Sequence, residues 1–117
     1  MASFELEQVQ EGDPAVAVVA VTGELDLSNA DELAEQLGVA AAGRPLVVDL
    51  SRVLFIDSAA LHRLFGVARE SGSGRLAVVA EPSAPIARTL EIVQFQRAAT
   101  VATSVGEACA ALARHHA

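Results

Sequence analysis

The 117-residue chain has one cysteine and contains no tryptophan, tyrosine or lysine. Because Cys109 has no second cysteine to pair with, the sequence excludes an intrachain disulfide and a metal site built from several thiolates. Acidic residues outnumber basic ones by 15 to 8, and the formal net charge is -7. The basic residues, all arginine, are scattered along the chain, so direct binding to nucleic acid or to an anionic membrane is not expected.

Long apolar runs are also missing, and no segment reaches the roughly 18–20 residues needed to cross a bilayer. Residues 1–13 are acidic and lack the basic and apolar regions of a signal peptide, which favours a cytoplasmic location. The hydrophobic fraction is nevertheless 52%, whereas aromatic residues make up only 3%. Abundant small and β-branched side chains are typical of a thin sheet covered by closely packed helices.

Catalytic and cofactor-binding motifs are absent from the sequence. There is no GK[ST] phosphate-binding loop, no GxGxxG and no GxSxG, and the SGSG segment at 71–74 follows a predicted helix instead of opening one. Ser58 and His62 lie one helical turn apart, but no third group is placed to orient the histidine. His115 and His116, at the C-terminal end, are not expected to bind a metal. We therefore predict no enzymatic activity, no metal site and no cofactor.

Hydrophobic periodicity predicts strands that alternate with helices. Apolar or alternating segments predict strands at residues 3–10, 15–21, 45–50, 75–80 and 100–102. Apolar stripes at helical spacing predict helices that start near Ser28, Ser58, Pro85 and Ser104. We expect the Ser28 and Ser104 side chains to cap the first and last of these helices.

The predicted order, ββαβαβαβα, defines one α/β domain over residues 1–117, since a chain of this length holds a single core. Helical crossovers make most strands parallel and leave the first as an antiparallel edge. We expect a mixed, mostly parallel sheet of four to five strands with about four helices. Residues 113–117 are expected to form a frayed tail.

The pair Asp57–Ser58 follows the apolar segment VLFI at 53–56 and stands where the second helix begins. Either residue is a good helix N-cap, and capping alone is a sufficient explanation of the pair. A serine at a helix N-terminus is also a favourable place for a phosphate, because free N–H groups and the helix dipole stabilise negative charge. Phosphorylation would add about -1.5 to -2 charges beside Asp57 and would repel an acidic group of a bound partner.

Three segments of the chain resemble the STAS domain family (sulfate transporter and anti-sigma factor antagonist). GELDLSNADEL at 23–33 is similar to the family's G-E-L-D turn into the first helix. LVVDLSRVLFIDSAAL at 46–61 is similar to its central strand and D-S-x-G-L segment, and residues 75–112 are similar to its last third. Each motif is weak alone, but their order and spacing are specific. The resemblance implies a single STAS-like α/β domain that works by binding a partner protein.

In the family's bacterial anti-sigma factor antagonists, the serine after the aspartate is phosphorylated by a partner that is both anti-sigma factor and serine kinase. The resemblance implies that Ser58 is the phosphorylation site and that the unphosphorylated chain binds this partner and releases a sigma factor. It also implies a phosphatase that resets the switch. The implied partner-binding residues are Asp26, Ser28, Asp57, Ser58, Ala59, Leu61 and His62.

The switch segment departs from the family's D-S-[ST]-G-L-G pattern at Ala60 and His62, which replace two glycines. Ala60 adds only a methyl group and favours a helix over glycine by about 1 kcal/mol. His62 is compatible with a clash against a docked kinase, with a contact to a phosphate on Ser58, and with a solvated position on the helix. Helical periodicity places Leu61 on the core side.

Two further hypotheses remain open. One is a non-switched STAS scaffold or accessory subunit that docks permanently on a larger complex, such as a stress-signalling assembly or a lipid-transport ABC system. The replaced glycines favour this hypothesis. The other is the sensing of a small ligand or nucleotide, for which the sequence offers no phosphate-cradling loop.

Overall fold

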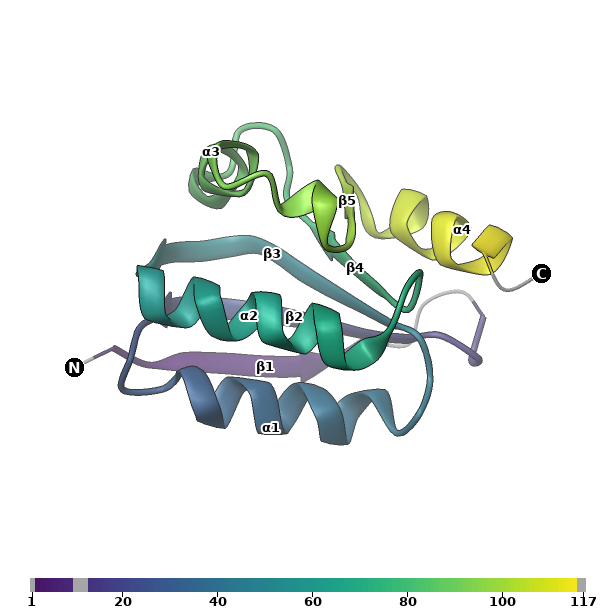
Figure 1. The fold of residues 1–117 in the computed structure, drawn as a ribbon, viewed down its shortest axis with the longest axis horizontal. Helices are drawn as coiled ribbons and strands as arrows, with labels where there is room; N and C mark the ends of the chain where they lie inside the picture. Colours follow the sequence, from purple (N-terminus) through teal and green to yellow (C-terminus); the bar gives the residue numbers. More distant parts are fainter. Residues whose placement is uncertain (1, 10–12, 116–117) are drawn as a thin grey trace.

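The computed structural model describes residues 2–9 and 13–115, which form one five-stranded sheet with helices on both faces (Figure 1). In chain order the elements are β1 (Phe4–Gln8), β2 (Ala17–Leu25), α1 (Ala30–Ala41), β3 (Leu46–Ile56), α2 (Ser58–Ser71), β4 (Leu76–Val79), α3 (Pro85–Ile92), the 3₁₀ helix η1 (Phe95–Arg97), β5 (Thr100–Ala102) and α4 (Val105–His115). This order confirms the predicted ββαβαβαβα fold. Of the tail predicted at 113–117, residues 116–117 lie outside the described residues.

The strands are arranged in the sheet in chain order, β1-β2-β3-β4-β5. β1 runs antiparallel to β2, with Leu6 opposite Val21, and all other neighbouring strands are parallel. The parallel pairs arise because α1, α2 and α3 each form the crossover between two consecutive strands. The predicted antiparallel edge strand is therefore confirmed.

The helices are divided unequally between the two faces of the sheet. α1, α2 and α3 pack on one face, where the main core includes Leu37, Leu64 and Leu90. Figure 1 shows α1 and α2 side by side in front of the sheet. α4 packs on the opposite face, where Ala108 and Leu112 contact a smaller cluster of valines and alanines from the strands. The sheet thus has one fully covered face and one partly covered face.

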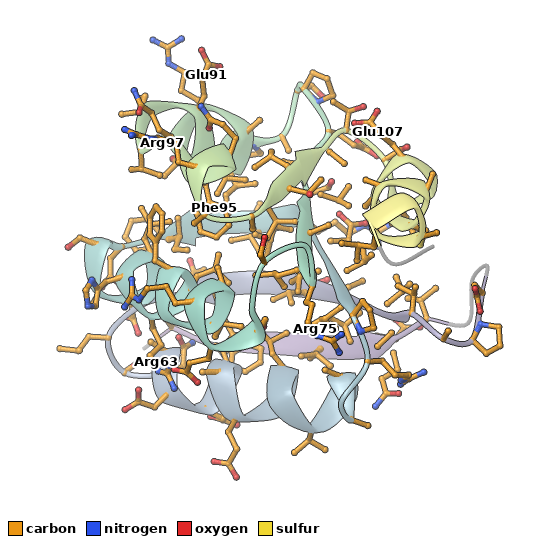
Figure 2. The ribbon with its side chains drawn as sticks, turned by 45° about the vertical axis from the view of Figure 1, so that its right-hand side comes forward. Arg63, Arg75, Glu91, Phe95, Arg97 and Glu107 are labelled. Carbon is orange, nitrogen blue, oxygen red and sulfur yellow. The ribbon has the colours of Figure 1, made fainter. Side chains whose placement is uncertain are left out.

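Phe95 connects the segment after α3 to α2. Its side chain is fully buried, and Figure 2 shows it on the side of η1 that faces the rest of the domain. Its ring centroid lies 4.6 Å from that of Phe65 on α2, with the two planes tilted by 47°. A tilted pair of this kind contributes about 0.5–1.5 kcal/mol beyond its buried area. The contact helps to hold α2, which begins at Ser58, in a fixed position.

Two strands are longer than the sequence predicts. The predicted strands span residues 15–21 and 45–50, whereas β2 continues to Leu25 and β3 to Ile56. Two register shifts interrupt the ladder between these strands, the second directly after Gly23. Such irregularities change which side chains share a face, so the apolar–polar alternation that predicts a strand is lost. Leu25, the last residue of the extended β2, has a fully buried side chain.

α4 begins as the sequence predicts. The Ser104 hydroxyl accepts a hydrogen bond from the Glu107 N–H at 3.1 Å, and the Glu107 carboxylate accepts from the Thr103 hydroxyl at 3.2 Å. The serine therefore satisfies one of the free N–H groups at the helix start.

Candidate functional site

The candidate site lies at the carboxyl ends of the neighbouring strands β2 and β3. Leu25 and Ile56 are the last paired residues of these strands, and the Asp57 N–H donates to the Leu25 carbonyl at 3.1 Å. The loop after β2 and the start of α2 therefore leave the sheet next to each other. All the site residues predicted from the sequence belong to these two segments, 26–28 and 57–62.

Asp57 is the N-cap of α2, and it joins the two segments. Its Oδ1 accepts the Ala60 N–H at 2.8 Å, and its Oδ2 accepts the Leu27 N–H at 3.2 Å. One carboxylate thus satisfies an N–H at the helix start and also holds the neighbouring loop. Of the two residues that the sequence offers as caps, Asp57 takes this role and leaves the Ser58 side chain available.

Replacing Asp57 by alanine is expected to lower the free energy of unfolding by about 2 kcal/mol, because a helix cap and a loop contact are lost together. Asp57→Asn is the matched control, because it keeps a carbonyl oxygen as an acceptor, and we expect it to cost about 1 kcal/mol. Urea unfolding measures both differences. An Asp57→Ala variant as stable as the unaltered chain would contradict the double role of this carboxylate.

Asn29 shapes the loop between β2 and α1, and nothing in the sequence patterns singled it out. Asn29 is 6% exposed, and within the described part of the chain it is the one polar residue that is buried. Its Oδ1 accepts the Asp26 N–H at 2.9 Å, and its Nδ2 donates to the Glu24 carbonyl at 3.0 Å. The preference of asparagine for bonding nearby backbone groups in turns is the signal that could have identified it.

Ser28 does not cap α1, contrary to the prediction. The helix begins at Ala30, and the residue before it, Asn29, makes no capping hydrogen bond through its side chain. The Ser28 hydroxyl and N–H instead both donate to Oδ1 of Asp26, at 2.5 and 2.8 Å. The hydroxyl thus serves as a donor to the Asp26 carboxylate in a local turn, and it does not accept an N–H of α1.

The Ser28 hydroxyl holds the pKa of the Asp26 carboxyl below its ordinary value of 3.8, and the N–H groups of Ser28 and Asn29 act in the same direction against partial desolvation. A carboxyl whose pKa is lowered by folding stabilises the fold above its unfolded-state pKa. This contribution is lost as the pH falls through the folded-state pKa. Asp26 therefore carries its negative charge throughout the neutral range.

Ser28→Ala is expected to raise the pKa of the Asp26 carboxyl toward 3.8, because the hydroxyl donor is the largest cause of the lowering. Titration of the Asp26 carboxyl by carbon-detected NMR measures the change. The stability difference between the two chains should be present at neutral pH and should vanish in acid, where Asp26 is protonated in both. An unchanged pKa in Ser28→Ala would contradict the assignment.

Ser58 is the first residue of α2, and its side chain is exposed. The Ser58 hydroxyl makes no hydrogen bond to another residue in the described part of the chain, and the first turn of α2 contains no acidic residue. Because Asp57 supplies the cap, a group added to the Ser58 oxygen disrupts no internal contact of the domain.

The other predicted residues of α2 differ in their access to solvent. His62 is exposed and Ala59 is half-buried, whereas Leu61 is only 9% exposed and packs in the main core. The Leu61 side chain therefore packs beneath the exposed residues of α2 and is not itself open to a partner. Ala60, which replaces a family glycine, is also buried at 1% exposed, so its additional methyl group is covered by the domain itself.

Three large apolar side chains next to these residues are exposed, and the sequence patterns did not identify them. Leu27 is 77% exposed, Leu54 68% and Phe55 54%. We call these three residues the apolar rim. Leu27 follows Asp26 in the loop held by Asp57. Leu54 and Phe55 lie near the end of β3, whose last residue, Ile56, directly precedes Asp57. In the continuous run VLFI no alternation marks which side chains face outward.

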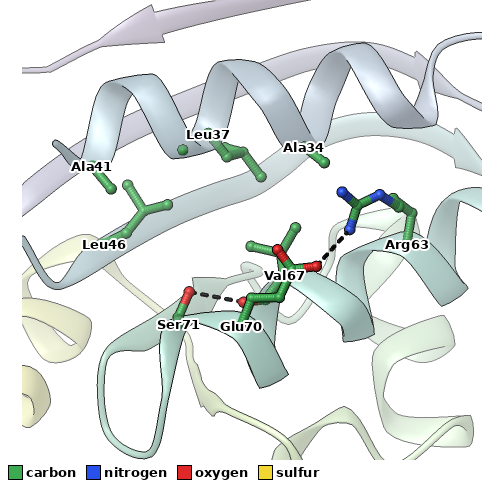
Figure 3. A pocket seen from close by; sticks show the side chains of 9 residues that line it. Ala34, Leu37, Ala41, Leu46, Arg63, Val67, Glu70 and Ser71 are labelled. Atoms are coloured by element: carbon green, nitrogen blue, oxygen red, sulfur yellow. Dashed lines mark hydrogen bonds and ion pairs between the residues drawn. The ribbon is translucent and has the colours of Figure 1, made fainter. Parts of the chain in front are cut away.

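Two of the pockets of the domain lie away from this surface. One of about 200 Å³ lies between α1 and α2, and the ion pair of Arg63 with Glu70, at 3.2 Å, borders it (Figure 3). A larger one of about 520 Å³ lies between α3 and β5. None of the predicted site residues lines either pocket. Small ligands bind in concave pockets, so the open surface at Ser58 is better suited to a protein partner.

Potential metal ligands do not gather within residues 2–9 and 13–115: no three histidine, cysteine, aspartate or glutamate side chains there are placed to hold an ion. Among the helices of the same residues, none combines the length and apolar character needed to span a membrane.

The family model for the STAS domain matches residues 8–108. An anti-sigma factor antagonist from Mycobacterium paratuberculosis has a similar structure, with a TM-score of 0.75 and 29% sequence identity over 92% of this chain and 94% of that chain. The anti-sigma factor antagonist SpoIIAA in its unphosphorylated form matches with a TM-score of 0.61 and 20% identity over 96% and 98% of the two chains. The phosphorylated form of SpoIIAA from Bacillus matches with a TM-score of 0.58 and 19% identity over 92% and 96%. At these lower identities the two SpoIIAA structures show a shared fold.

Proposed function

The chain belongs to the STAS domain family, and we propose that it is an anti-sigma factor antagonist switched by phosphorylation of Ser58. In the unphosphorylated state it binds an anti-sigma factor that has serine kinase activity, and this binding releases a sigma factor. Phosphorylation ends the binding, and a phosphatase restores it. The chain acts in the cytoplasm as substrate and binding partner, and the catalytic groups belong to the kinase and the phosphatase.

One observation carries this proposal: Ser58 is exposed at the start of α2, and its hydroxyl makes no hydrogen bond within the described residues. A kinase can reach such an oxygen without unfolding the helix. Two carboxylates, Asp57 and Asp26, lie in the adjoining segments. A phosphoryl group on Ser58 adds to their negative charge, so an acidic or apolar partner surface that fits the unmodified site is repelled or left poorly solvated.

The apolar rim supports binding to a protein. Leu27 lies in one of the two segments that Asp57 joins, and Leu54 and Phe55 shortly precede the other, so three large apolar side chains are exposed near the site. Burial of such side chains contributes most of the affinity at the centre of a protein interface. The partner surface should therefore be apolar where it covers the rim, and apolar or acidic where it approaches the Ser58 hydroxyl, so that a phosphoryl group there is left without its water or is repelled.

Phe55→Ser is expected to weaken the complex with the anti-sigma factor at least tenfold, because the partner loses an apolar contact of about 1.5–3 kcal/mol. Val39→Ser is the matched control, because Val39 is 72% exposed near the end of α1 that is farther from the site. Isothermal titration calorimetry measures both affinities. Equal losses for the two variants would contradict a partner surface at the rim.

Incubation with the cognate kinase and ATP, followed by mass spectrometry of the intact chain and its peptides, tests the proposed switch. We expect a single phosphate on Ser58 and none on a Ser58→Ala variant. Ser104, which is also exposed at a helix start, is the internal control and should stay unmodified. Absence of phosphate on Ser58, combined with an ATPase or scaffold complex that binds the chain whatever residue stands at 58, would establish the accessory-subunit hypothesis instead.

A further inference from the structure

We propose that His62 binds the phosphoryl group of phosphorylated Ser58, so that the imidazole forms part of the switch. The inference rests on the proposed phosphorylation of Ser58 and goes beyond it by assigning a phosphate-binding residue. The ligand is a phosphate monoester on the same helix. His62 stands where the family pattern has a glycine, so the assignment gives this replacement a function.

The helix places the two side chains next to each other. α2 runs without interruption from Ser58 to Ser71, so Ser58 and His62 are separated by four residues on one helical face. Side chains at this spacing have Cβ atoms about 5–6 Å apart, a gap that a phosphoryl group and an imidazole can close. Both side chains are exposed, so no packed neighbour prevents the contact.

The charged groups around the pair are already engaged. Asp57 accepts two N–H groups and Asp26 accepts the Ser28 donors. Neither carboxylate is hydrogen-bonded or ion-paired to the imidazole within the described residues. Arg63, the next residue of α2, pairs with Asp31 of α1 at 3.3 Å and with Glu70 at 3.2 Å.

η1, which packs on α2 through Phe95, carries Arg97, and that guanidinium donates to Gln94 at 3.3 Å. His62 makes no hydrogen bond or ion pair with another residue in the described part of the chain. It is therefore the side chain in the first turns of α2 that can become cationic and is free to turn toward Ser58.

The chemistry of the two groups is matched near neutral pH. A phosphoserine loses its second proton near pH 6, and an imidazole takes up a proton in the same range. The imidazolium N–H donates to a phosphoryl oxygen, which gives a charge-assisted hydrogen bond. Because the imidazolium favours the dianion, His62 should lower the second pKa of the phosphoserine.

The test uses a chain in which phosphoserine is inserted at position 58 during translation, so no kinase is needed. Phosphorus NMR follows the second ionisation of the phosphate with pH in this chain and in its His62→Gln variant. We expect the midpoint to lie about half a pH unit lower in the chain that keeps His62, and the difference to shrink in about 1 M salt. Circular dichroism checks that both chains are folded, as the exposure of His62 leads us to expect.

Phosphoserine inserted at position 104 is the matched control, because it also stands at a helix start and has Ala108 four residues later. Its midpoint should be unaffected by His62→Gln. Equal midpoints for position 58 in the two chains would overturn the assignment, and so would an equal displacement at position 104. Failure of the kinase to modify Ser58 would count against the proposed function alone, since the inserted phosphoserine tests His62 independently.

Discussion

Gly23→Ala is expected to lower the free energy of unfolding by about 3 kcal/mol or more, the largest effect of any single methyl group that we predict here. Gly23 has φ +118°, a backbone conformation that L side chains rarely adopt. A Cβ at this position would lie 2.4 Å from the Ser3 carbonyl oxygen and 3.1 Å from Phe4 Cα. Both atoms belong to the backbone, so the start of β1 must move to make room.

The expected damage extends to the candidate site. The Glu24 N–H donates to the same Ser3 carbonyl at 2.9 Å, and a register shift of the β2–β3 ladder lies at this point. A displaced β1 would therefore disturb the end of β2, from which the loop of Asp26 and Asn29 continues. The glycine of the G-E-L-D segment thus has a structural role, because it allows β1 and β2 to approach each other closely beside the site.

Gly38→Ala is the control for this prediction. Gly38 lies in α1 beside the pocket shown in Figure 3, and a Cβ there would meet no atom within 4 Å. We expect the substitution to stabilise the chain by about 0.5–1 kcal/mol, because alanine favours a helix over glycine. Urea unfolding compares the two variants. A Gly23→Ala chain as stable as Gly38→Ala would contradict the close approach of β1.

The sequence was sufficient for the order of the elements and for the position of Ser58. Apolar periodicity in α2 reflects packing of one helix face on the sheet, and continuous apolar strands reflect burial on both faces of the sheet. A cap at Asp57 or Ser58 followed from the local chemistry of helix starts, and the structure decided for Asp57. These features depend on neighbours in the sequence, so they are accessible without a structure.

The parts that were missed depend on hydrogen bonds and register shifts that apolar patterns do not record. Phe55 is exposed because two register shifts in β2 and β3 change the face of the strand, which no single segment reveals. Ser28 looked like a cap until Asp26 proved to be its acceptor. Asn29 is buried because Glu24 and Asp26 turn around it. In each case several arrangements of the backbone or side chain are compatible with the sequence, and composition and spacing do not decide between them.

The second large effect is the loss of partner affinity on phosphorylation. A phosphoryl group adds about -1.5 to -2 charges at a surface that already holds Asp26 and Asp57. It also places three strongly solvated oxygens beside the apolar rim, where a bound partner would have to strip their water. Together these terms should weaken the complex at least about 100-fold, which corresponds to roughly 2.7 kcal/mol.

The dissociation constant of the complex with the anti-sigma factor, measured by calorimetry for chains with serine and with phosphoserine at position 58, tests the switch most directly. Phosphoserine at position 104 controls for charge added elsewhere on the domain. We expect tight binding with serine, at least about 100-fold weaker binding with phosphoserine at 58, and little change with phosphoserine at 104. Equal dissociation constants for serine and phosphoserine at position 58 would contradict a switch at this hydroxyl.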